Sequence, residues 1–423
     1  MNSGSRGWRF LPAKFQTDLQ TMFRSLKNRN FRIYAIGQLI SVSGTWMQSV
    51  ALSWLVYQLT DSPLALGFVS FASLVPVLLF SFFAGSIADK KDRKKIIEIT
   101  NIVGAIQATV LAVLTLLGML TVPVVVALAV FLGLATAFQL PARQAFVPDL
   151  VEDDELINAV GLNSAIFNIS RMVGPVLAGM FMAWLGASAC FILNALSYVV
   201  AVITLRMVTP RKKDGKMLDG ALAETGESLW HVLRKTGVAD LLLLTSVMSI
   251  FGFQFAVLMP VIAKTVLSGG ATELGYLNAA LGVGALVGSL ALAARGKGRN
   301  LWQIMGYATL VFCLGIVLLA FSTSLALSLL AAALSGLCMS TLFVGGNTQV
   351  QLVTPEAVRG RVLGIYTFTL IGLAPFGSLI AGYAAQALGI KTALLITAAI
   401  CALVSTIYLW LRRKHQGEQG GGA

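Results

Sequence analysis

One arginine stands deep inside a long apolar stretch of this sequence, where a charge is costly. Arg171 shares a helical face with Ser164 and Asn168, so the three polar side chains form a stripe that we expect to be turned away from lipid. An ionisable residue inside a membrane segment is a functional-site hypothesis by default. Arg171 can attract an anionic substrate such as a catecholate or a carboxylate, or it can bind carbonyl groups that nearby Pro175 leaves free. The sequence leaves both roles open.

A second polar stripe occupies one face of the first apolar stretch. Gln38, Ser41, Thr45 and Gln48 recur at helical spacing within residues 32–59. Amide and hydroxyl groups of this kind either contact a polar ligand or form hydrogen bonds between helices. The stripe alone does not separate these two roles.

The apolar stretches show no set of side chains that could carry out catalysis. Nucleophilic and metal-assisted catalysis require a nucleophile with a base, or clustered metal ligands, and no such pair is evident inside the apolar stretches. No phosphate-binding lysine motif of the Walker type occurs, so we expect that ATP does not drive the chain directly. We expect no catalytic residue, no metal site, no cofactor and no enzyme activity. The cysteines stand singly as packing residues and the histidines lie in polar segments: Cys190, Cys313, Cys338, Cys401, His231 and His415.

The composition predicts the elements that carry these residues. Hydrophobic residues make up 57% of the 423 residues and charged residues only 12%, whereas soluble domains carry about a quarter charged residues. A hydrocarbon core of about 30 Å needs roughly 20 residues of helix, and the apolar runs are solid, without the alternation of membrane β-strands. The sequence therefore predicts an all-α membrane protein with twelve transmembrane helices. The runs cover residues 32–59, 64–88, 96–119, 122–145, 158–184, 187–208, 238–266, 273–294, 301–321, 325–348, 360–386 and 390–411.

Positive charge lies almost entirely on one side of these runs. With a cytoplasmic N-terminus, all but three of the 31 lysines and arginines fall in cytoplasmic segments, the exceptions being Lys264, Lys391 and Arg171. This asymmetry satisfies the positive-inside rule, and it explains the net charge of +13 without nucleic-acid binding. The basic N-terminal segment shows no cleavable signal peptide. We expect both termini to be cytoplasmic, with residues 12–29 either an interfacial helix on the membrane or a disordered tail.

Polar and proline residues between the apolar runs recur at one fixed spacing in the two halves of the chain. Gln144 and Pro148 in the first half match Gln351 and Pro355 in the second. Each half holds an even number of runs, so both enter the membrane from the same side, and such a parallel repeat places a substrate path at the interface between halves. The predicted divisions are a cytoplasmic N-terminal segment 1–31, a six-helix half 32–208, a cytoplasmic linker 209–236, a second six-helix half 237–412 and a cytoplasmic tail 413–423.

A charged motif interrupts the chain after the second run. It reads GSIADKKDRKK, from Gly85 to Lys95. With its glycine, aspartate and basic residues at this spacing, the chain resembles the major facilitator superfamily over nearly its whole length, with Asp92 where that family usually has glycine. We expect Asp92 to be tolerated, because aspartate visits left-handed backbone conformations more readily than most residues. The resemblance implies the major facilitator fold of two six-helix halves.

The resemblance also implies a gating role for this motif. The gating candidates are Gly85, Asp89 and Arg93. Asp89 ends the second run, where it can pair with Arg93 and face the start of the eleventh run near Glu356, because a helix N-terminus carries a partial positive charge. Such a latch would close the cytoplasmic side. The alternative is that the neighbouring cations merely anchor the topology.

A second motif, in the fifth run, resembles the antiporter motif of exporters in this superfamily, with Ser170 and Ala178 in place of glycine. Together with GTWMQSVALSWLVYQLT in the first run and LPARQAFVPDLV after the fourth, it places the resemblance in the branch of the enterobactin exporter and drug-efflux members. Small residues on one face let helices approach closely, so we expect this stripe to pack against a similar one in the eighth run; the alternative is that these are the generic small residues of any membrane helix. The helix-packing candidates are Gly161, Ser170, Gly174, Pro175, Ala178, Gly179, Ala280, Gly284 and Gly288.

The superfamily's cavity is lined by the first, fourth, seventh and tenth helices, which turns the polar stripe of the first run into a set of candidate substrate contacts. The substrate-binding candidates are Gln38, Ser41, Thr45, Gln48, Asn168 and Arg171, with Trp46, Gln254 and Asn347 as further members. The alternative for these residues is a role in interhelix hydrogen bonds only.

The resemblance implies a secondary active transporter of the bacterial inner membrane. It would export a small amphipathic molecule, such as a siderophore or a drug, by alternating access. Proton antiport follows from the resemblance alone, because no acidic residue lies in the middle of a run. The expected partners are the substrate, the proton and the lipid bilayer, and the expected state is a monomer. Two alternatives stay open: a flippase for lysophospholipid or another amphipath, and a non-transporting receptor of the same fold.

Overall fold

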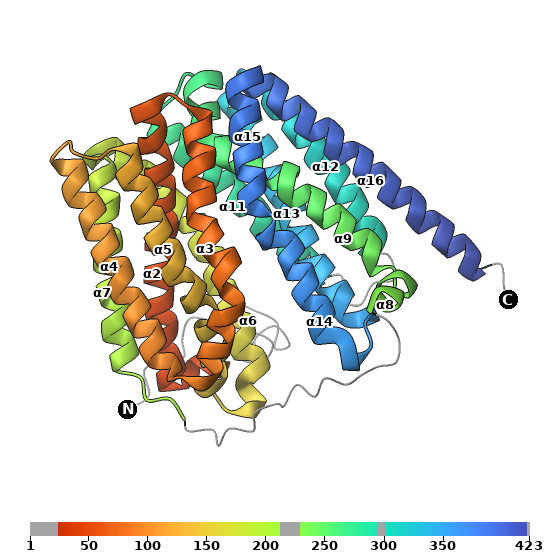
Figure 1. The fold of residues 1–423 in the computed structure, drawn as a ribbon, viewed down its shortest axis with the longest axis horizontal. Coiled ribbons are helices and arrows are strands. Elements are labelled where there is room, and N and C mark those ends of the chain that lie inside the picture. Colours follow the sequence, from red (N-terminus) through yellow and green to blue (C-terminus); the bar gives the residue numbers. More distant parts are fainter. Residues whose placement is uncertain (1–23, 212–228, 295–300, 421–423) are drawn as a thin grey trace, which may run out of the picture.

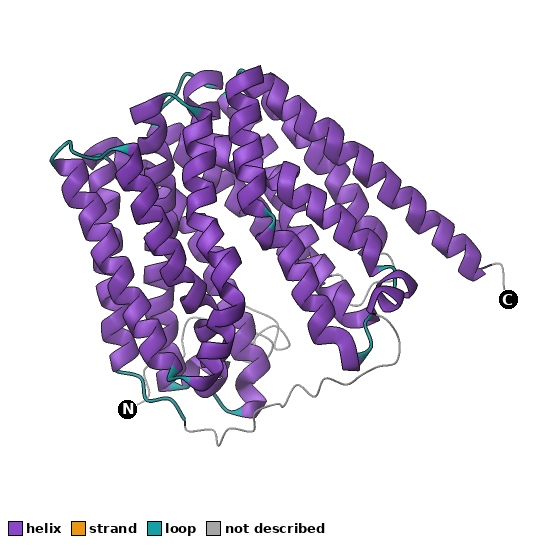
Figure 2. Ribbon diagram, viewed as in Figure 1, coloured by secondary structure: helices purple, strands orange, loops and turns teal. Residues whose placement is uncertain are grey.

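A computed structural model describes residues 24–211, 229–294 and 301–420. Within these ranges the chain is helical and contains no strand (Figure 2), and twelve helical segments are long and apolar enough to cross a membrane. The predicted all-α class and the predicted number of transmembrane helices are confirmed. Most of the predicted interfacial segment 12–29 and residues 212–228 of the predicted linker lie outside the described residues.

Six long helices form a first group. Within it, α2 packs on α6 and α7, α3 packs on α5, and α4 packs on both α5 and α7. Three short turns, η1 Arg24–Lys27, η2 Val147–Asp149 and η3 Asp153–Glu155, lie at one end of this group. The six helices are α2 Arg29–Thr60, α3 Pro63–Lys90, α4 Arg93–Leu116, α5 Val122–Phe146, α6 Leu156–Leu185 and α7 Ala187–Arg206.

The second group follows a short helix, α8 Leu229–Lys235, and combines four continuous helices with two interrupted ones. The continuous helices are α11 Ala271–Ala294, α12 Leu301–Phe321, α13 Leu325–Val353 and α16 Ile390–Gly420. One interrupted helix consists of α9 Val238–Val247, η4 Met248–Gly252, η5 Phe253–Leu258, α10 Met259–Val261 and η6 Ile262–Val266, and the other of α14 Glu356–Thr367, η7 Phe368–Gly372 and α15 Ala374–Leu388.

The interruptions are wide and tight helical turns that the apolar pattern did not predict. Turns η4, η6 and η7 are of the wide π type, and η5 is a tight 3₁₀ segment. Wide turns of this kind free backbone groups, and they occur frequently at functional sites. Here the two interrupted helices bond to each other: the hydroxyls of Thr245 and Thr369 lie 3.0 Å apart, and Ser249 Oγ donates to the carbonyl of Leu370 at 2.8 Å.

Polar side chains at the helix starts explain several boundaries. Asn28 accepts hydrogen bonds from the backbone of α2, Ser62 from α3 and Asp92 from α4, and each such cap satisfies an otherwise unpaired backbone N–H. Asp92 accepts from the N–H groups of Lys94 and Lys95 with φ −62° and ψ 106°. The left-handed conformation that we considered for Asp92 is therefore not adopted, because this residue serves as a helix cap.

The two groups are joined over only part of their length. We call the end that holds Arg29 and Lys90 the basic end, and the end that holds Asp61 the opposite end. From the middle of the bundle toward the opposite end, α3 contacts α15 and α6 contacts α11. Helix α14 lies at the basic end and makes its main contacts with α13, η7 and α9 of its own group. Figure 1 shows the two groups diverging toward the basic end.

The apolar core lies inside each group and continues across the joined region. In the second group Phe253 stacks with Phe343 at a centroid distance of 5.2 Å and meets Phe312 edge-on. A smaller buried cluster around Phe31 and Phe146 closes the basic end of the first group. The larger buried cluster therefore spans both groups, and the smaller one belongs to the first group alone. The exact division boundaries stay predictions.

Candidate functional site

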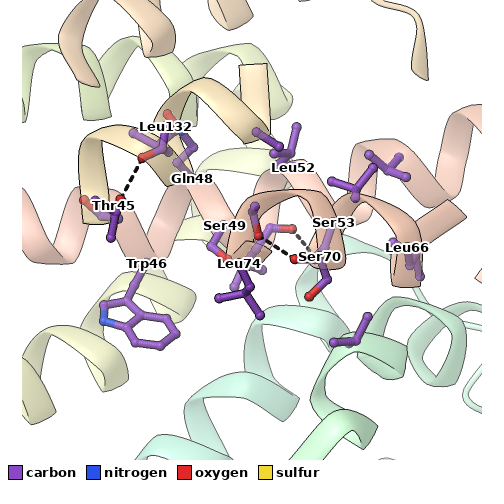
Figure 3. Close-up of a pocket in the computed structure, with 18 of the residues that line it drawn as sticks. Thr45, Trp46, Gln48, Ser49, Leu52, Ser53, Leu66, Ser70, Leu74 and Leu132 are labelled. Carbon is purple, nitrogen blue, oxygen red and sulfur yellow. Dashed lines mark hydrogen bonds between the residues drawn. The ribbon is translucent and has the colours of Figure 1, made fainter. Parts of the chain in front are cut away.

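A cavity of about 390 Å³ lies where the two groups meet. Helices α2, α3 and α5 form most of its wall, Gln107 of α4 adds an amide, and Ala256, Val257 and Asn278 close it from the second group. No ionisable side chain lines it among the described residues. In Figure 3 the hydroxyls of Ser49, Ser53 and Ser70 gather in one part of the cavity, and Trp46 stands at its margin. The cavity therefore suits an uncharged polar group attached to an apolar body.

A directional chain of buried amides reaches this cavity from within the first group. Ser197 Oγ donates to the backbone carbonyl of Asn194 at 2.7 Å and lies 2.9 Å from Asn194 Oδ1, and Asn194 Nδ2 donates to Gln48 Oε1 at 2.9 Å. Gln48 Nε2 then donates to Gln107 Oε1 at 3.0 Å. The side-chain carbonyl of Gln107 therefore accepts a hydrogen bond from Gln48. The Nε2 atom of Gln107 is buried and has no hydrogen-bond partner among the described residues.

The predicted polar stripe of α2 falls into two parts. Thr45 and Gln48 line the cavity, and so does the further candidate Trp46. Gln38 and Ser41 are buried closer to the basic end and do not line it. Thr45 and Gln48 also bond between helices, to Tyr198 at 3.2 Å and to Gln107. The two roles that the sequence left open therefore coexist at these positions.

The other two further candidates, Gln254 and Asn347, do not line this cavity. Gln254 is buried and donates to the backbone carbonyl of Ser249 at 2.8 Å, within its own interrupted helix. Asn347 accepts from Gln351 Nε2, one turn later on α13. Both side chains are therefore engaged in local hydrogen bonds.

Arg143 is a candidate that the sequence interpretation missed. It lies on α5, about two turns from the cavity-lining part of that helix, and its guanidinium donates to Gln38 Oε1. The phenol of Tyr34 lies nearby and is buried. No carboxylate pairs with Arg143 within the described part of the chain. The motif LPARQAF had been counted with the cytoplasmic basic segments, and its position inside an apolar run was the available signal.

Arg171 lies on the face of α6 between two packed faces. Ser170 and Gly174 on one side abut α2 at Leu39 and Ser43. Met172 and Gly179 on the other side abut Gly282 and Gly275 of α11. Because Arg171 falls between these faces on the helical wheel, its side chain extends toward the interface between the groups.

The guanidinium of Arg171 lies 3.5 Å from Asn168 Oδ1, beyond the length of an ordinary hydrogen bond. Asn168 itself donates to the carbonyl of Ser164 at 3.0 Å. The three residues of the predicted stripe thus stay together on α6. Neither Asn168 nor Arg171 lines the described cavity.

The small-residue stripes are packed, but against partners other than those expected. A Cβ atom at Gly174 would lie 2.6 Å from Trp46 Cβ of α2, and one at Gly288 would lie 2.5 Å from the carbonyl oxygen of Leu337 on α13. Gly284 likewise abuts Ala333 of α13. The expected pairing of helices α6 and α11 is present, but Gly174 and Gly284 face away from each other, because each stripe packs inside its own group.

The α6–α11 seam is made by other small residues. Gly179 meets Gly275, and a Cβ built on Gly275 would lie 2.7 Å from the Cα of Gly179. Gly282 lies against Met172 in the same way. Pro175 contributes its carbonyl at this seam, and α6 continues through it as one helix. Gly161 has open space where a side chain would be.

Two of the gating candidates have defined surroundings. Arg93 donates to the Asp149 carboxylate at 3.0 and 3.1 Å and to the carbonyl of Ala145 at 3.1 Å. Its described ion pair is thus with η2, where we had considered Asp89 as its partner. Gly85 has open space around it, and the side chain of Asp89 lies outside the described atoms.

Polar contacts between the groups occur at the opposite end. Lys264 of η6 pairs with Asp61, which ends α2 in a left-handed conformation with φ 46°. One residue later, Ser62 Oγ donates to Gln386 Oε1 of α15 at 2.9 Å. At the basic end, the described ion pairs such as Arg93–Asp149, at 3.0 Å, stay within one group. This asymmetry agrees with a bundle that is closed at one end.

A protein-family model described as transmembrane secretion effector matches residues 20–419. The staphyloferrin A transporter of Staphylococcus aureus is 26% identical over 377 residues, covering 88% of this chain and 93% of its own. The multidrug efflux pump Tap of Mycolicibacterium fortuitum is 27% identical over 388 residues, covering 88% and 93%. Macrolide efflux protein A of Streptococcus pyogenes is 24% identical over 402 residues, covering 91% and 98%.

Solved structures share the fold at low sequence identity. A bacterial homologue of the human lysosomal transporter Spinster, in an inward-facing and unoccupied conformation, matches with a TM-score of 0.71 and 12% identity over 91% of this chain and 97% of that chain. A D-xylose–proton symporter matches with a TM-score of 0.70 and 13% identity over 89% and 96%. These likenesses concern the fold alone.

Proposed function

This chain belongs to the transmembrane secretion effector family of the major facilitator superfamily, and from this premise we propose that it exports a small amphipathic molecule across the bacterial inner membrane. The observation that carries the proposal is the cavity between the groups, with its uncharged polar lining. Export by alternating access requires such a site to open to one side of the membrane at a time. The family relationship makes the chain a transporter and not an enzyme.

The direction of export rests on which end is cytoplasmic. The positive-inside rule assigns the basic end, with Lys90, Lys94 and Arg206, to the cytoplasm. Both termini are then cytoplasmic, because α2 begins and α16 ends on that side. In this orientation the divergence of the two groups opens toward the cytoplasm, where an exporter collects its substrate.

Two neighbouring regions indicate the chemistry of the substrate: the part of the first group that holds two arginines, and the cavity. Arg143 and Arg171 stand without a carboxylate partner among the described residues, on α5 and α6, and they favour a negatively charged group. The adjoining cavity offers hydroxyls, amides and the indole of Trp46, and it favours an uncharged apolar or aromatic body. A siderophore or a drug with an acidic group unites these features. Relatives named for a siderophore, for multiple drugs and for macrolides agree with that class.

Coupling and gating complete the proposal. We propose a monomer that exchanges the substrate for protons. No carboxylate lines the cavity among the described residues, so the proposal of proton exchange rests on the family relationship. Asp89, with Gly85 and Arg93, would then form the cytoplasmic latch when the groups close at the basic end. In Figure 1 α14 and the end of α3 lie apart, which agrees with a latch that forms only when the groups close.

Directional flux tests the proposal. The purified protein is reconstituted into proteoliposomes with an acidic interior, and the entry of staphyloferrin A and of a macrolide is measured; carriers that present the basic end outward should accumulate at least one of them. Collapsing the proton gradient should abolish the accumulation. Binding without flux would identify a receptor, and movement of lysophospholipid without flux of either probe would identify a flippase. Either outcome would overturn export of a soluble amphipath.

A further inference from the structure

The buried amide of Gln107 ends the hydrogen-bond chain at the cavity with one donor left over. Gln107 is 1% exposed, lines the cavity, and its Nε2 has no hydrogen-bond partner within the described part of the chain. Its Oε1 already accepts from Gln48. Rotating the Gln107 amide alone would place its Nε2 against the Nε2 of Gln48, two donors facing each other, so the orientation of Gln107 is coupled to that of Gln48.

An unmade hydrogen bond at such a place is unfavourable. A buried donor without an acceptor loses its hydration and gains nothing in exchange. That cost is removed when an acceptor enters the cavity, so the empty site favours ligands that carry one. A donor on a side chain that lines a ligand-sized cavity is therefore a selective feature, since a ligand without an acceptor leaves the cost in place.

Several of the lining hydroxyls already donate to the backbone. Ser53 Oγ donates to the carbonyl of Val50 at 2.9 Å, and Ser73 Oγ donates to Ser70 at 2.8 Å. Thr136 Oγ1 donates to Leu132 in the same way. These hydroxyl oxygens remain available as acceptors. Gln107 Nε2 is thus a donor in a wall whose engaged hydroxyls present acceptors.

The charge of the acceptor follows from the lining. No cation lines the cavity among the described residues, and a carboxylate placed there would lose its hydration without an opposite charge. A carbonyl, amide or ether oxygen needs only a neutral donor. We propose that Gln107, held by Gln48 and Asn194, forms a subsite that selects a neutral hydrogen-bond acceptor on the uncharged part of the substrate, an inference that rests on the proposed function for its physiological meaning.

A matched pair of small probes tests the subsite directly. Benzophenone and diphenylmethane have the same two rings and nearly the same size, but only benzophenone carries a carbonyl acceptor. Dissociation constants are measured for the purified full-length protein in detergent, by quenching of tryptophan fluorescence. After correction for the partition of each probe into the detergent, the dissociation constant of the wild-type protein should be roughly tenfold lower for benzophenone than for diphenylmethane. Equal affinities after that correction would overturn the subsite without requiring any variant.

Variants then assign the preference to one side chain. Gln107→Met removes the donor but also the acceptor of Gln48 Nε2, which lines the cavity, so it is combined with Gln48→Met. The double variant should abolish the preference for benzophenone while leaving diphenylmethane binding within about twofold, and Gln48→Met alone, which keeps Gln107 Nε2, should retain the preference. Gln139→Met is the matched control, because Gln139 is another interhelix amide, bonded to Asn101 at 2.9 Å, that does not line the cavity. A preference that persists in Gln48→Met/Gln107→Met, or that disappears in Gln48→Met or in Gln139→Met, would contradict the assignment.

The probe measurement is independent of transport. A benzophenone preference together with absent flux would keep the subsite and overturn export. Flux of a macrolide or a siderophore without any benzophenone preference would keep export and overturn the subsite.

Discussion

Arg171 is the residue at which a role in anion binding and a structural role predict different outcomes. Its guanidinium extends toward the interface between the groups, and it has no described partner closer than Asn168 at 3.5 Å. If Arg171 binds an anion, Arg171→Gln should weaken the anionic ligand roughly tenfold, about 1.4 kcal/mol, and spare a neutral ligand of similar size. Arg171→Lys should retain part of the affinity, because it keeps the charge and loses the planar fork.

The measurement for Arg171 is a pair of dissociation constants, for a carboxylate ligand and for its methyl ester. Arg211→Gln serves as the control, because Arg211 pairs with Glu152 at 3.4 Å on the exposed loop after α7. Equal weakening of the acid and the ester by Arg171→Gln, together with a lower melting temperature in detergent, would assign Arg171 a structural role near Pro175.

For individual residues, the sequence indicated which side chains are polar but not which partners they contact. The stripe on α2 and the lone Arg171 stood out because polar groups are rare in apolar runs. Gln107 did not, since a single glutamine carries no pattern, and its role depends on an amide chain that crosses three helices. Asp92 was interpreted through backbone freedom, whereas its side chain caps α4.

Among the elements, the seam between α6 and α11 holds the two groups together through glycines. A Cβ atom on Gly179 would lie 3.0 Å from the Cα of Gly275, so a larger residue there must push the helices apart. Overpacking of this kind costs about 1–3 kcal/mol. Gly179→Val should therefore lower the melting temperature in detergent by several degrees and reduce transport.

Gly161 provides the matched control for this substitution. It lies on the same helix and has open space where a side chain would be. Gly161→Val introduces the same residue with the same helix propensity, and it should leave the melting temperature nearly unchanged. Similar losses in both variants would show that the seam is not the sensitive contact, and that valine disturbs α6 itself.

The helices themselves were well predicted and their interruptions were not. Hydropathy and length determine where a helix can cross the membrane, so all twelve segments were found close to their observed positions. Small residues permit close packing but do not indicate which helix is the partner. The stripes of α6 and α11 were therefore predicted to pack on each other, whereas they pack on α2 and α13. The wide turns at Met248–Gly252 and Phe368–Gly372 depend on contacts between two distant helices, which an apolar pattern does not contain.

For the whole molecule, the central feature is the cavity of about 390 Å³ between two groups that are closed at the opposite end and apart at the basic end. The Asp61–Lys264 pair and the Ser62–Gln386 hydrogen bond cross between the groups at the closed end. Both must separate before the cavity can open to that side. Reversing one charge of the pair replaces attraction by repulsion, so Lys264→Glu should favour the alternative arrangement that is open at the opposite end.

Distances between spin labels at the two ends measure this directly. With the four buried cysteines replaced by alanine, one pair of labels is placed at Lys91 and Arg361, at the basic end, and another at Leu117 and Thr323, at the opposite end. Lys391→Glu is the control, because the Lys391 ammonium lies over Phe321 within the second group, 4.2 Å from the ring centre. In Lys264→Glu the basic-end distance should shorten while the opposite-end distance lengthens, and the control should change neither. Separation at the opposite end without closure at the basic end, or no change at either end, would contradict a cavity that is exposed alternately to the two sides.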